Sequence, residues 1–197
     1  MNKDLIVEIK KELRANMNGV ASAVMRQTDD YRVNFGIELP RVQQIAAEFQ
    51  PDRHLAQILW HESVRECKIL ATILMPVEEF DEELCDIWTS EIRTVEIAQI
   101  YALNLVRRLP FASQKAFEWI SAEDGLLRVI GYFTMCHVLR KGEMSPRSAD
   151  ELFDHLACDI GSSDGQLSKA ALKALQIFAN QSDENMNKAK KLGDYLL

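Results

Sequence analysis

Apolar residues recur at intervals of three or four along almost the whole chain, and this spacing limits the fold more than any other feature. Near the start of the chain the series is Leu5, Ile9, Leu13, Met17 and Val20. An α-helix has 3.6 residues per turn, so it gathers such residues on one face. The alternating pattern of a half-buried strand does not occur over any useful length. The spacing therefore predicts an all-α protein.

Glycine and proline interrupt the apolar segments at short intervals, as at Gly36 with Pro40 and at Gly142 with Pro146. Loops of a few residues place consecutive helices antiparallel. A one-sided surface helix followed by a more buried helix, repeated along the chain, is typical of stacked helical pairs. We expect about ten helices, at roughly 3–25, 39–49, 52–60, 63–75, 79–91, 94–109, 113–121, 125–140, 145–157, 165–180 and 182–196.

Length and composition suggest one domain and no membrane span. With 197 residues, of which 47% are hydrophobic, the chain can form one sizeable core, and we expect a single domain over 1–197. The longest charge-free apolar run, at 129–139, has about half of the roughly 20 residues that a membrane span needs. The first 17 residues carry acids and bases throughout and do not resemble a secretory signal. We therefore expect a cytoplasmic protein without a membrane partner.

The sequence gives no sign of a metal or cofactor site. Its four cysteines are 18, 51 and 22 residues apart, which leaves no CxxC pair for zinc. The segment HESVRE, which starts at His61, resembles the beginning of a zinc-protease helix, but Arg65 stands where the second histidine is required. Glycine-rich nucleotide-binding motifs are also missing. We expect no metal and no cofactor.

Charge is unevenly distributed between the two halves of the chain. Residues 1–99 hold 11 Lys and Arg against 18 Asp and Glu, whereas residues 100–197 hold 12 of each kind. Six carboxylates fall within residues 77–86 alone, a run that is usually a solvated helix start. The net field repels polyanions, so any surface for DNA must be a local basic patch.

Two neighbouring stretches carry the resemblance to a known family. They contain Tyr31, Arg32, Phe35, Gly36, Leu39, Pro40, Val42, Ile45 and Ala46, and then Leu59, Trp60, Ser63, Arg65, Glu66, Leu70, Ala71 and Leu74. In these residues the chain resembles the bacterial DNA alkylation-repair glycosylases, which are built from HEAT-like repeats. The resemblance extends over about 31–109 and, more weakly, 123–178. It implies a curved superhelical stack of antiparallel helical pairs whose basic concave face holds double-stranded DNA.

The catalytic positions that the resemblance implies are altered in this chain. The family's Trp-Asp-x-x-Asp segment falls on 95–99, with Val95 at the Trp, Glu96 at the first Asp and Gln99 at the second, catalytic Asp. Excision of an alkylated purine needs a carboxylate to stabilise a cationic sugar and an aromatic face to hold the base. Val95 and Gln99 supply neither group. Glu96, three residues before Gln99, is the fallback candidate for a relocated carboxylate.

Two further positions of the family pattern also differ. The Arg of the family's Arg-x-Gly-aromatic stretch falls on Val129. Arg128 lies one residue earlier, which is about 100° away around a helix. Lys173 stands at a late Trp position.

Basic side chains remain as candidates for contacts with DNA phosphates. Several of them end predicted helices, where Lys and Arg are favoured in any protein, so the same residues also have an ordinary structural explanation. The candidates are Arg107, Arg108, Arg128, Arg140, Lys141, Lys169 and Lys173.

Three functions are consistent with this pattern. The first is a member of the alkylation-repair family that binds DNA or damaged DNA without an intact glycosylase centre. The second is a helical module whose partner is another protein, which the acidic balance favours. The third is an active alkylpurine glycosylase with its carboxylate relocated to Glu96.

Overall fold

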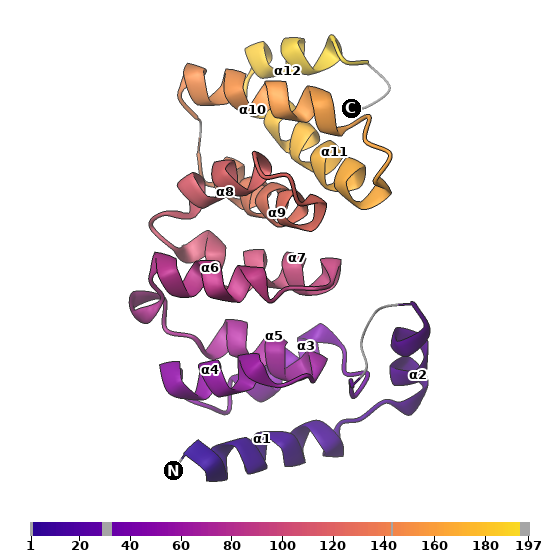
Figure 1. Cartoon of the computed structure of the whole chain (residues 1–197), viewed down its shortest axis with the longest axis vertical. Coiled ribbons are helices and arrows are strands. Elements are labelled where there is room, and N and C mark those ends of the chain that lie inside the picture. Colours follow the sequence, from indigo (N-terminus) through magenta and orange to yellow (C-terminus); the bar gives the residue numbers. More distant parts are fainter. Residues whose placement is uncertain (1, 29–32, 143, 194–197) are drawn as a thin grey trace. The chain divides into compact units, whose positions relative to one another are not determined.

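A computed structural model describes residues 2–28, 33–142 and 144–193, and Figure 1 shows its helices in chain order. Within these ranges the chain forms α- and 3-10 helices and no strand, apart from one isolated bridge between Val33 and Val64. The prediction of an all-α protein is confirmed. Tyr31 and Arg32, which contribute to the family resemblance, lie outside the described residues.

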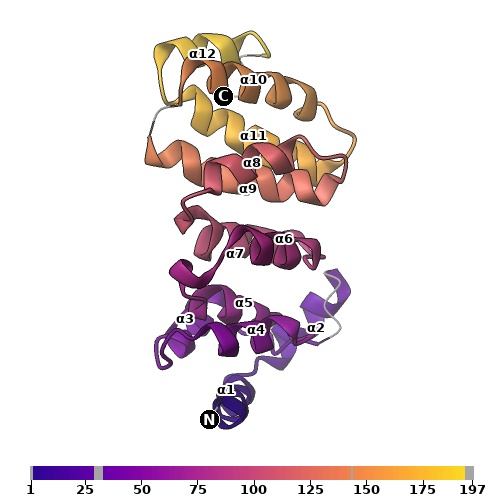
Figure 2. The same cartoon turned by 60° about the vertical axis from the view of Figure 1, so that its left-hand side comes forward.

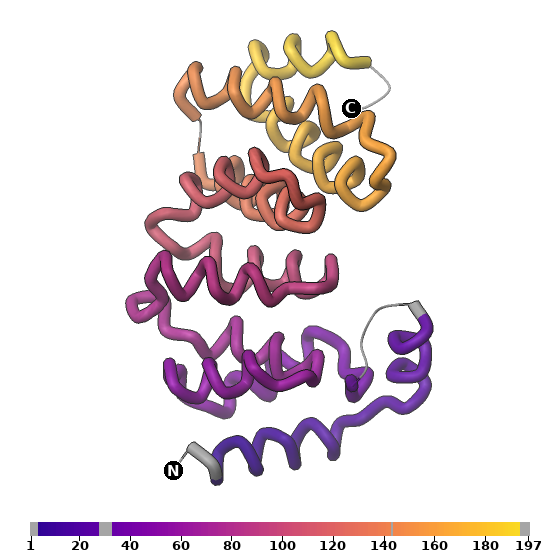
Figure 3. The backbone as a smooth tube through the Cα atoms, in the orientation of Figure 1, coloured from indigo at the N-terminus to yellow at the C-terminus, as the bar shows by residue number. Residues whose placement is uncertain are grey.

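The chain divides into two compact units, Met1–Leu105 and Val106–Leu197. Unit 1 contains α1 (Asn2–Ala15), α2 (Gly19–Thr28), α3 (Leu39–Ala46), α4 (Arg53–His61), α5 (Arg65–Leu74), η1 (Val77–Glu79), α6 (Glu82–Ser90) and α7 (Val95–Asn104). Unit 2 contains η2 (Val106–Arg108), α8 (Ala112–Ile120), α9 (Gly125–Lys141), α10 (Pro146–Asp159), α11 (Gly165–Ala179) and α12 (Asp183–Lys190). Figures 1 and 3 show short connections between neighbouring helices such as α4 and α5, α6 and α7, and α8 and α9.

The core of unit 1 is centred on α5, which packs against α3, α4 and α7. An aromatic group extends this core toward α6. The fully buried rings of Trp60 and Trp88 stack with their centroids 4.3 Å apart, and Phe80 and Tyr101 pack around them. The hydroxyl of Tyr101 donates to the carbonyl of Cys85, so α6 and α7 are also joined by a buried hydrogen bond.

The core of unit 2 is centred on α9, which packs against α8 on one side and α11 on the other. Figure 2 shows the close pairing of α8 and α9 from a second direction. A Cβ atom at Gly131 of α9 would lie 2.8 Å from the backbone nitrogen of Ile120, so glycine permits this close approach. The fully buried Leu175 and Phe178 of α11 contribute to the same core.

Polar side chains at the helix starts explain why most helices begin where they do. Asp52, Asp81, Thr94, Asp124 and Ser145 each accept a hydrogen bond from a backbone N–H group in the first turn of the following helix. Such caps satisfy N–H groups that have no partner within the helix. Pro40 and Pro146 occupy first-turn positions, where proline needs no N–H donor.

The predicted helix over 3–25 is wrong, because the structure has two helices there. The side chain of Asn18 accepts from the N–H of Ala21 and so begins α2, while its own N–H donates to the carbonyl of Phe35. The helix predicted over 94–109 also ends early, at Asn104. Leu105 caps the helix, with its N–H still donating to the carbonyl of Tyr101, and the 3-10 helix Val106–Arg108 follows before Pro110.

Candidate nucleic-acid interface

The positions that correspond to the family's catalytic segment lie in the first two turns of α7, in unit 1. Thr94 caps this helix. Val95 and Glu96 are half-buried, and Gln99 is exposed. The structure thus places an aliphatic group and an amide where the resemblance calls for an aromatic ring and a carboxylate.

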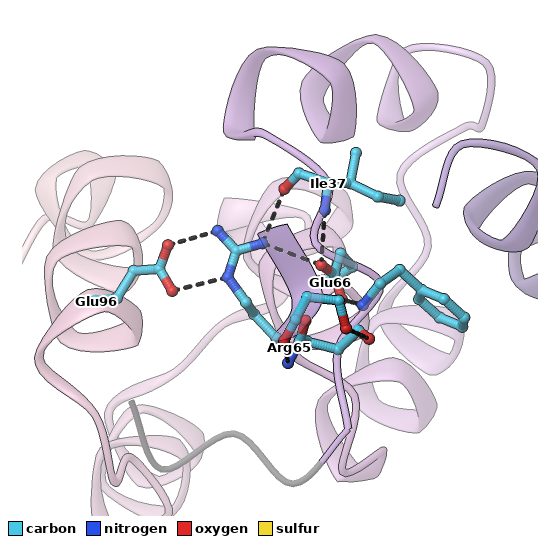
Figure 4. Close-up of polar contacts among 7 residues, drawn as sticks. Ile37, Arg65, Glu66 and Glu96 are labelled. Atoms are coloured by element: carbon cyan, nitrogen blue, oxygen red, sulfur yellow. Dashed lines mark hydrogen bonds and ion pairs between the residues drawn. The ribbon is translucent and has the colours of Figure 1, made fainter. Parts of the chain in front are cut away.

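Glu96 is engaged in a two-pronged ion pair with Arg65 of α5, which Figure 4 shows. Arg65 Nε donates to Glu96 Oε2 at 2.8 Å, and a terminal guanidinium nitrogen donates to Oε1 at 2.5 Å. This pairing of two parallel hydrogen bonds is the strong form of an Arg–carboxylate contact. Both carboxylate oxygens of Glu96 are therefore already used by the scaffold.

Arg65 and Glu66 together hold the segment before α3, as Figure 4 also shows. The fully buried carboxylate of Glu66 accepts from the N–H groups of Phe35 and Ile37, at 3.0 and 3.2 Å. Arg65 donates to the carbonyl of Ile37 and to Glu66. Burial alone would lower the pKa of Arg65, but its hydrogen bond with Glu96 and the two negative charges raise it overall.

Gly36 explains the shape of the segment that Arg65 and Glu66 hold. Its φ is +68°, and a Cβ atom there would lie 2.4 Å from Asn18 O and from Ser22 N. Gly36, Arg65 and Glu66 are among the residues that carry the family resemblance. In this protein they link α2, α3, α5 and α7 through hydrogen bonds, ion pairs and close backbone packing.

Arg128 has a structural partner in unit 2. Its guanidinium forms an ion pair with Asp159, the last residue of α10. The Tyr132 hydroxyl donates to the same carboxylate at 2.6 Å. Burial and this hydrogen bond raise the pKa of Tyr132. Val129, at the family's Arg position, is 1% exposed and belongs to the core.

Four of the predicted basic residues gather around His137 of α9. Arg107, Arg140, Lys141 and Lys173 are all exposed, and they come from η2, the end of α9 and α11. Their positive charges all act on the half-buried His137 ring. Burial, followed by these four charges, lowers the pKa of His137 to about 4. We refer to these four basic residues as the cation cluster.

Contacts within unit 2 define the positions of three members of the cation cluster. Lys141 Nζ donates to the carbonyl of Arg107, which joins α9 to η2. Lys173 Nζ lies 6.0 Å from the ring centroid of Phe133. The exposed Lys169 is one turn before Lys173 on α11, and the exposed Arg108 follows Arg107 on η2. Four of the seven predicted basic residues therefore belong to the cation cluster. Lys169 and Arg108 lie next to members of the cluster along the chain, and Arg128 pairs with Asp159 instead.

A hollow of about 370 Å³ adjoins the cation cluster at Lys141. Three hydroxyl side chains line it, those of Ser113 in the first turn of α8 and of Ser145 and Ser148 at the start of α10. Serine hydroxyls and lysine ammonium groups are common partners of phosphate in DNA complexes. Sequence reasoning missed these serines, because residues 113 and 145 are distant in the chain and only the fold brings them to one hollow.

Within 2–28, 33–142 and 144–193, no three His, Cys, Asp or Glu side chains group in a way that could hold a metal ion. Over those same ranges, no helix is long and apolar enough to cross a membrane. Cys67, Cys85 and Cys136 are buried thiols, and Cys158 is exposed.

The paired helices define an all-α protein of the HEAT-like repeat class. A family model described as DNA alkylation repair enzyme matches residues 9–189. The chain therefore belongs to the DNA alkylation repair enzyme family. The fold and family that the sequence predicted are confirmed.

A solved structure has the same fold, with a TM-score of 0.86 over 96% of this chain and 82% of that chain. It is described as representing a new family of proteins related to the HEAT-like repeat DNA glycosylases, with affinity for branched DNA structures. The two sequences are 17% identical, so the likeness concerns the fold alone. No curated protein gives a significant match.

Proposed function

We propose that this protein binds DNA through the cation cluster of unit 2 and does not act as an alkylpurine glycosylase. The observation that carries this proposal is that α9 brings four exposed basic side chains together. Arg140 and Lys141 end this helix, Lys141 Nζ donates to the carbonyl of Arg107, and Lys173 Nζ lies 6.0 Å from the Phe133 ring centroid on the same helix. Membership of a DNA-repair family supports DNA as the polyanion. The cation cluster would contact phosphates and would therefore be insensitive to base sequence.

The second half of the proposal depends on α7. Val95 has no aromatic face for an alkylated base, and the exposed amide of Gln99 carries no negative charge to stabilise a cationic sugar. Glu96 is the candidate for a relocated carboxylate, and Arg65 already binds both of its oxygens. Recruiting Glu96 to catalysis would leave the buried guanidinium of Arg65 without one of its partners, which is costly.

The kind of DNA is suggested by the related fold. The family represented by the matched structure is described as having affinity for branched DNA structures. We therefore include branched DNA, together with plain duplex DNA and damaged DNA, among the ligands of this protein. The cation cluster is a small basic patch on a protein with a net negative charge, so a single linear duplex contacts it with few phosphates. At a branch point, phosphates from two arms lie close together, and both arms can contact the same patch.

The test uses purified protein with fluorescent duplexes that are plain, branched or carry one alkylated purine, at about 50 and 200 mM salt. We expect binding that weakens steeply at the higher salt and no release of the alkylated base. Arg140→Ala combined with Lys173→Ala should weaken binding to every duplex. Release of the base would overturn the second half of the proposal and support Glu96 as a relocated catalytic carboxylate.

A protein-binding module is the second candidate, and one observation favours it. Val7, Met17, Val20 and Val24, on and between α1 and α2 of unit 1, are each more than half exposed. Exposed apolar groups of this kind are typical of protein contacts. Absence of DNA binding even at about 50 mM salt would favour this candidate over the first.

A further inference from the structure

Two rings lie at the surface of α9 inside the cation cluster. Phe133 and His137 are four residues apart, so they occupy neighbouring positions on one face of this helix. Both side chains are half-buried, whereas the adjacent Tyr132 is fully buried and bound to Asp159. Lys173 Nζ lies 6.0 Å from the Phe133 centroid, and its positive charge is among those that lower the pKa of His137.

Rings that alternate with cations form a specific kind of nucleic-acid surface. Bases stack on the ring faces while the cations follow the phosphates, and this combination binds single strands with little sequence preference. His137 fits this role because its lowered pKa leaves the ring uncharged at neutral pH. An uncharged imidazole adds a flat stacking surface without increasing the repulsion among the four surrounding cations.

We infer that Phe133 and His137 form a stacking face for unpaired DNA bases, with Lys173 and Arg140 holding the adjacent phosphates. This inference rests on the proposed DNA-binding function and names its preferred ligand, which is DNA with unpaired bases. When a base covers the Phe133 ring, the Lys173 ammonium moves from the ring to a phosphate. Two favourable contacts then replace one long cation–ring contact.

Intact duplex DNA cannot use the stacking face. Its bases are already paired and stacked, so only its phosphates are available to the cation cluster. Single-stranded DNA, and the unpaired nucleotides of a gap or branch point, can use both the cations and the rings. The inference therefore predicts a preference for single-stranded over double-stranded DNA that depends on the ring of Phe133.

The experiment measures binding of a fluorescent oligo-dT of about 16 nucleotides and of a blunt duplex of the same length, at one low salt concentration. The full-length wild type should bind the oligo-dT more tightly than the duplex. Phe133→Leu keeps an apolar side chain but removes the flat ring. It should weaken oligo-dT binding about tenfold and change duplex binding less than about twofold.

Two variants separate stacking from a structural role. Phe133→Trp keeps a ring, so it should retain the oligo-dT preference, and the fluorescence of the new indole should be quenched as oligo-dT binds. Phe117→Leu alters a half-buried phenylalanine on α8 and should leave both affinities unchanged. Lys173→Ala should weaken binding to both DNAs, because the ammonium serves the phosphates of either ligand.

The outcomes distinguish this inference from the function on which it rests. Equal affinities for the two DNAs, or equal effects of Phe133→Leu on both, would overturn the stacking face while leaving phosphate binding intact. Failure to bind either DNA at low salt would overturn the proposed function as well. An oligo-dT preference that Phe133→Leu removes and Phe133→Trp keeps would support the inference.

Discussion

At the scale of single residues, Glu66 has the most demanding position in unit 1. Its carboxylate is fully buried and accepts from two backbone N–H groups and from Arg65. Glu66→Gln removes the negative charge that pairs with Arg65. It also places an amide NH2 group, which can only donate, against the N–H groups of Phe35 and Ile37 or the Arg65 guanidinium. We expect a loss of about 3 kcal/mol in the free energy of unfolding. Urea unfolding followed by tryptophan fluorescence measures this loss.

The matched control for Glu66 is Glu48→Gln, which alters an exposed carboxylate after α3. It should change the free energy of unfolding by less than about 0.5 kcal/mol. Equal effects of the two substitutions would show that Glu66 does not hold the segment around Gly36.

Gly36 is the second residue whose replacement should be costly. Its φ of +68° disfavours any side chain, and a Cβ atom would collide with the backbone of Asn18 and Ser22. We expect Gly36→Ala to cost at least about 2 kcal/mol in the free energy of unfolding. Gly19→Ala is the control, because nothing lies within 4 Å of its added Cβ. Thermal unfolding should show a lower Tm for the first variant only.

The sequence could predict part of this residue-scale picture. It indicates a glycine turn at Gly36 and the loss of the family's acid at Gln99, since both are properties of single positions. It could not predict that Arg65 binds Glu96, because 31 residues separate them and only the packing of α5 against α7 brings them together. The role of Glu96 as a partner of Arg65 is therefore a result of tertiary structure.

At the scale of the elements, α9 makes the protein sensitive to mild acid. Burial and the charges of Arg107, Arg140, Lys141 and Lys173 lower the pKa of His137 from 6.5 to about 4. A proton therefore binds the unfolded chain more readily than the folded one between these values. His137 contributes stability that is fully present above pH 6.5 and is lost as the pH falls toward 4.

The pH dependence of His137 is measurable by two methods. NMR titration of its ring protons should give a midpoint near the lowered pKa of about 4. His137→Asn should flatten the decline of the unfolding free energy over the same pH range, because it removes the titrating group. A midpoint close to 6.5 in the folded protein would contradict the burial of the ring together with the placement of the four cations around it.

Some helix boundaries can be predicted from nearby residues and others cannot. Capping residues such as Asp52 and Asp124 predict helix starts well, because the cap acts within three residues. The apolar spacing continues through 16–18, so it could not reveal the break between α1 and α2. That break depends on the bond between Asn18 and Phe35, which closes a contact between distant parts of the chain.

At the scale of the whole molecule, charge limits how strongly DNA can bind. The net charge is −7, and the residues of unit 1 carry all of that excess because those of unit 2 balance. The proposed DNA binding then relies mainly on the cation cluster. If each of its four members contacts one phosphate, the logarithm of the DNA-binding constant should fall with the logarithm of the salt concentration with a slope of about −3 to −4. Lys141→Ala should reduce the slope by about one.

Lys188→Ala is the control for the salt dependence, because Lys188 pairs with Asp150 and Glu184. It should leave the slope unchanged. A slope near zero for the wild type would contradict binding through phosphates, even if some DNA binding were detected.

The sequence led us to expect a single domain over 1–197, and cooperative unfolding is the property that tests this expectation. The boundary between the two units falls between Leu105 and Val106, which are consecutive and both fully buried. Boundaries between independent domains usually lie in exposed linkers. We therefore predict that both units unfold in one transition.

The three tryptophans allow that prediction to be tested directly. Trp60 and Trp88 belong to unit 1 and Trp119 belongs to unit 2. Trp119→Phe leaves fluorescence from unit 1 alone, and Trp60→Phe with Trp88→Phe leaves fluorescence from unit 2 alone. For each variant, urea unfolding is followed by fluorescence and by far-ultraviolet circular dichroism, which reports all helices. Coincident curves within each variant would mean that the units unfold together. A fluorescence transition that separates from the circular dichroism transition would mean that one unit unfolds independently, and the chain would then consist of two domains.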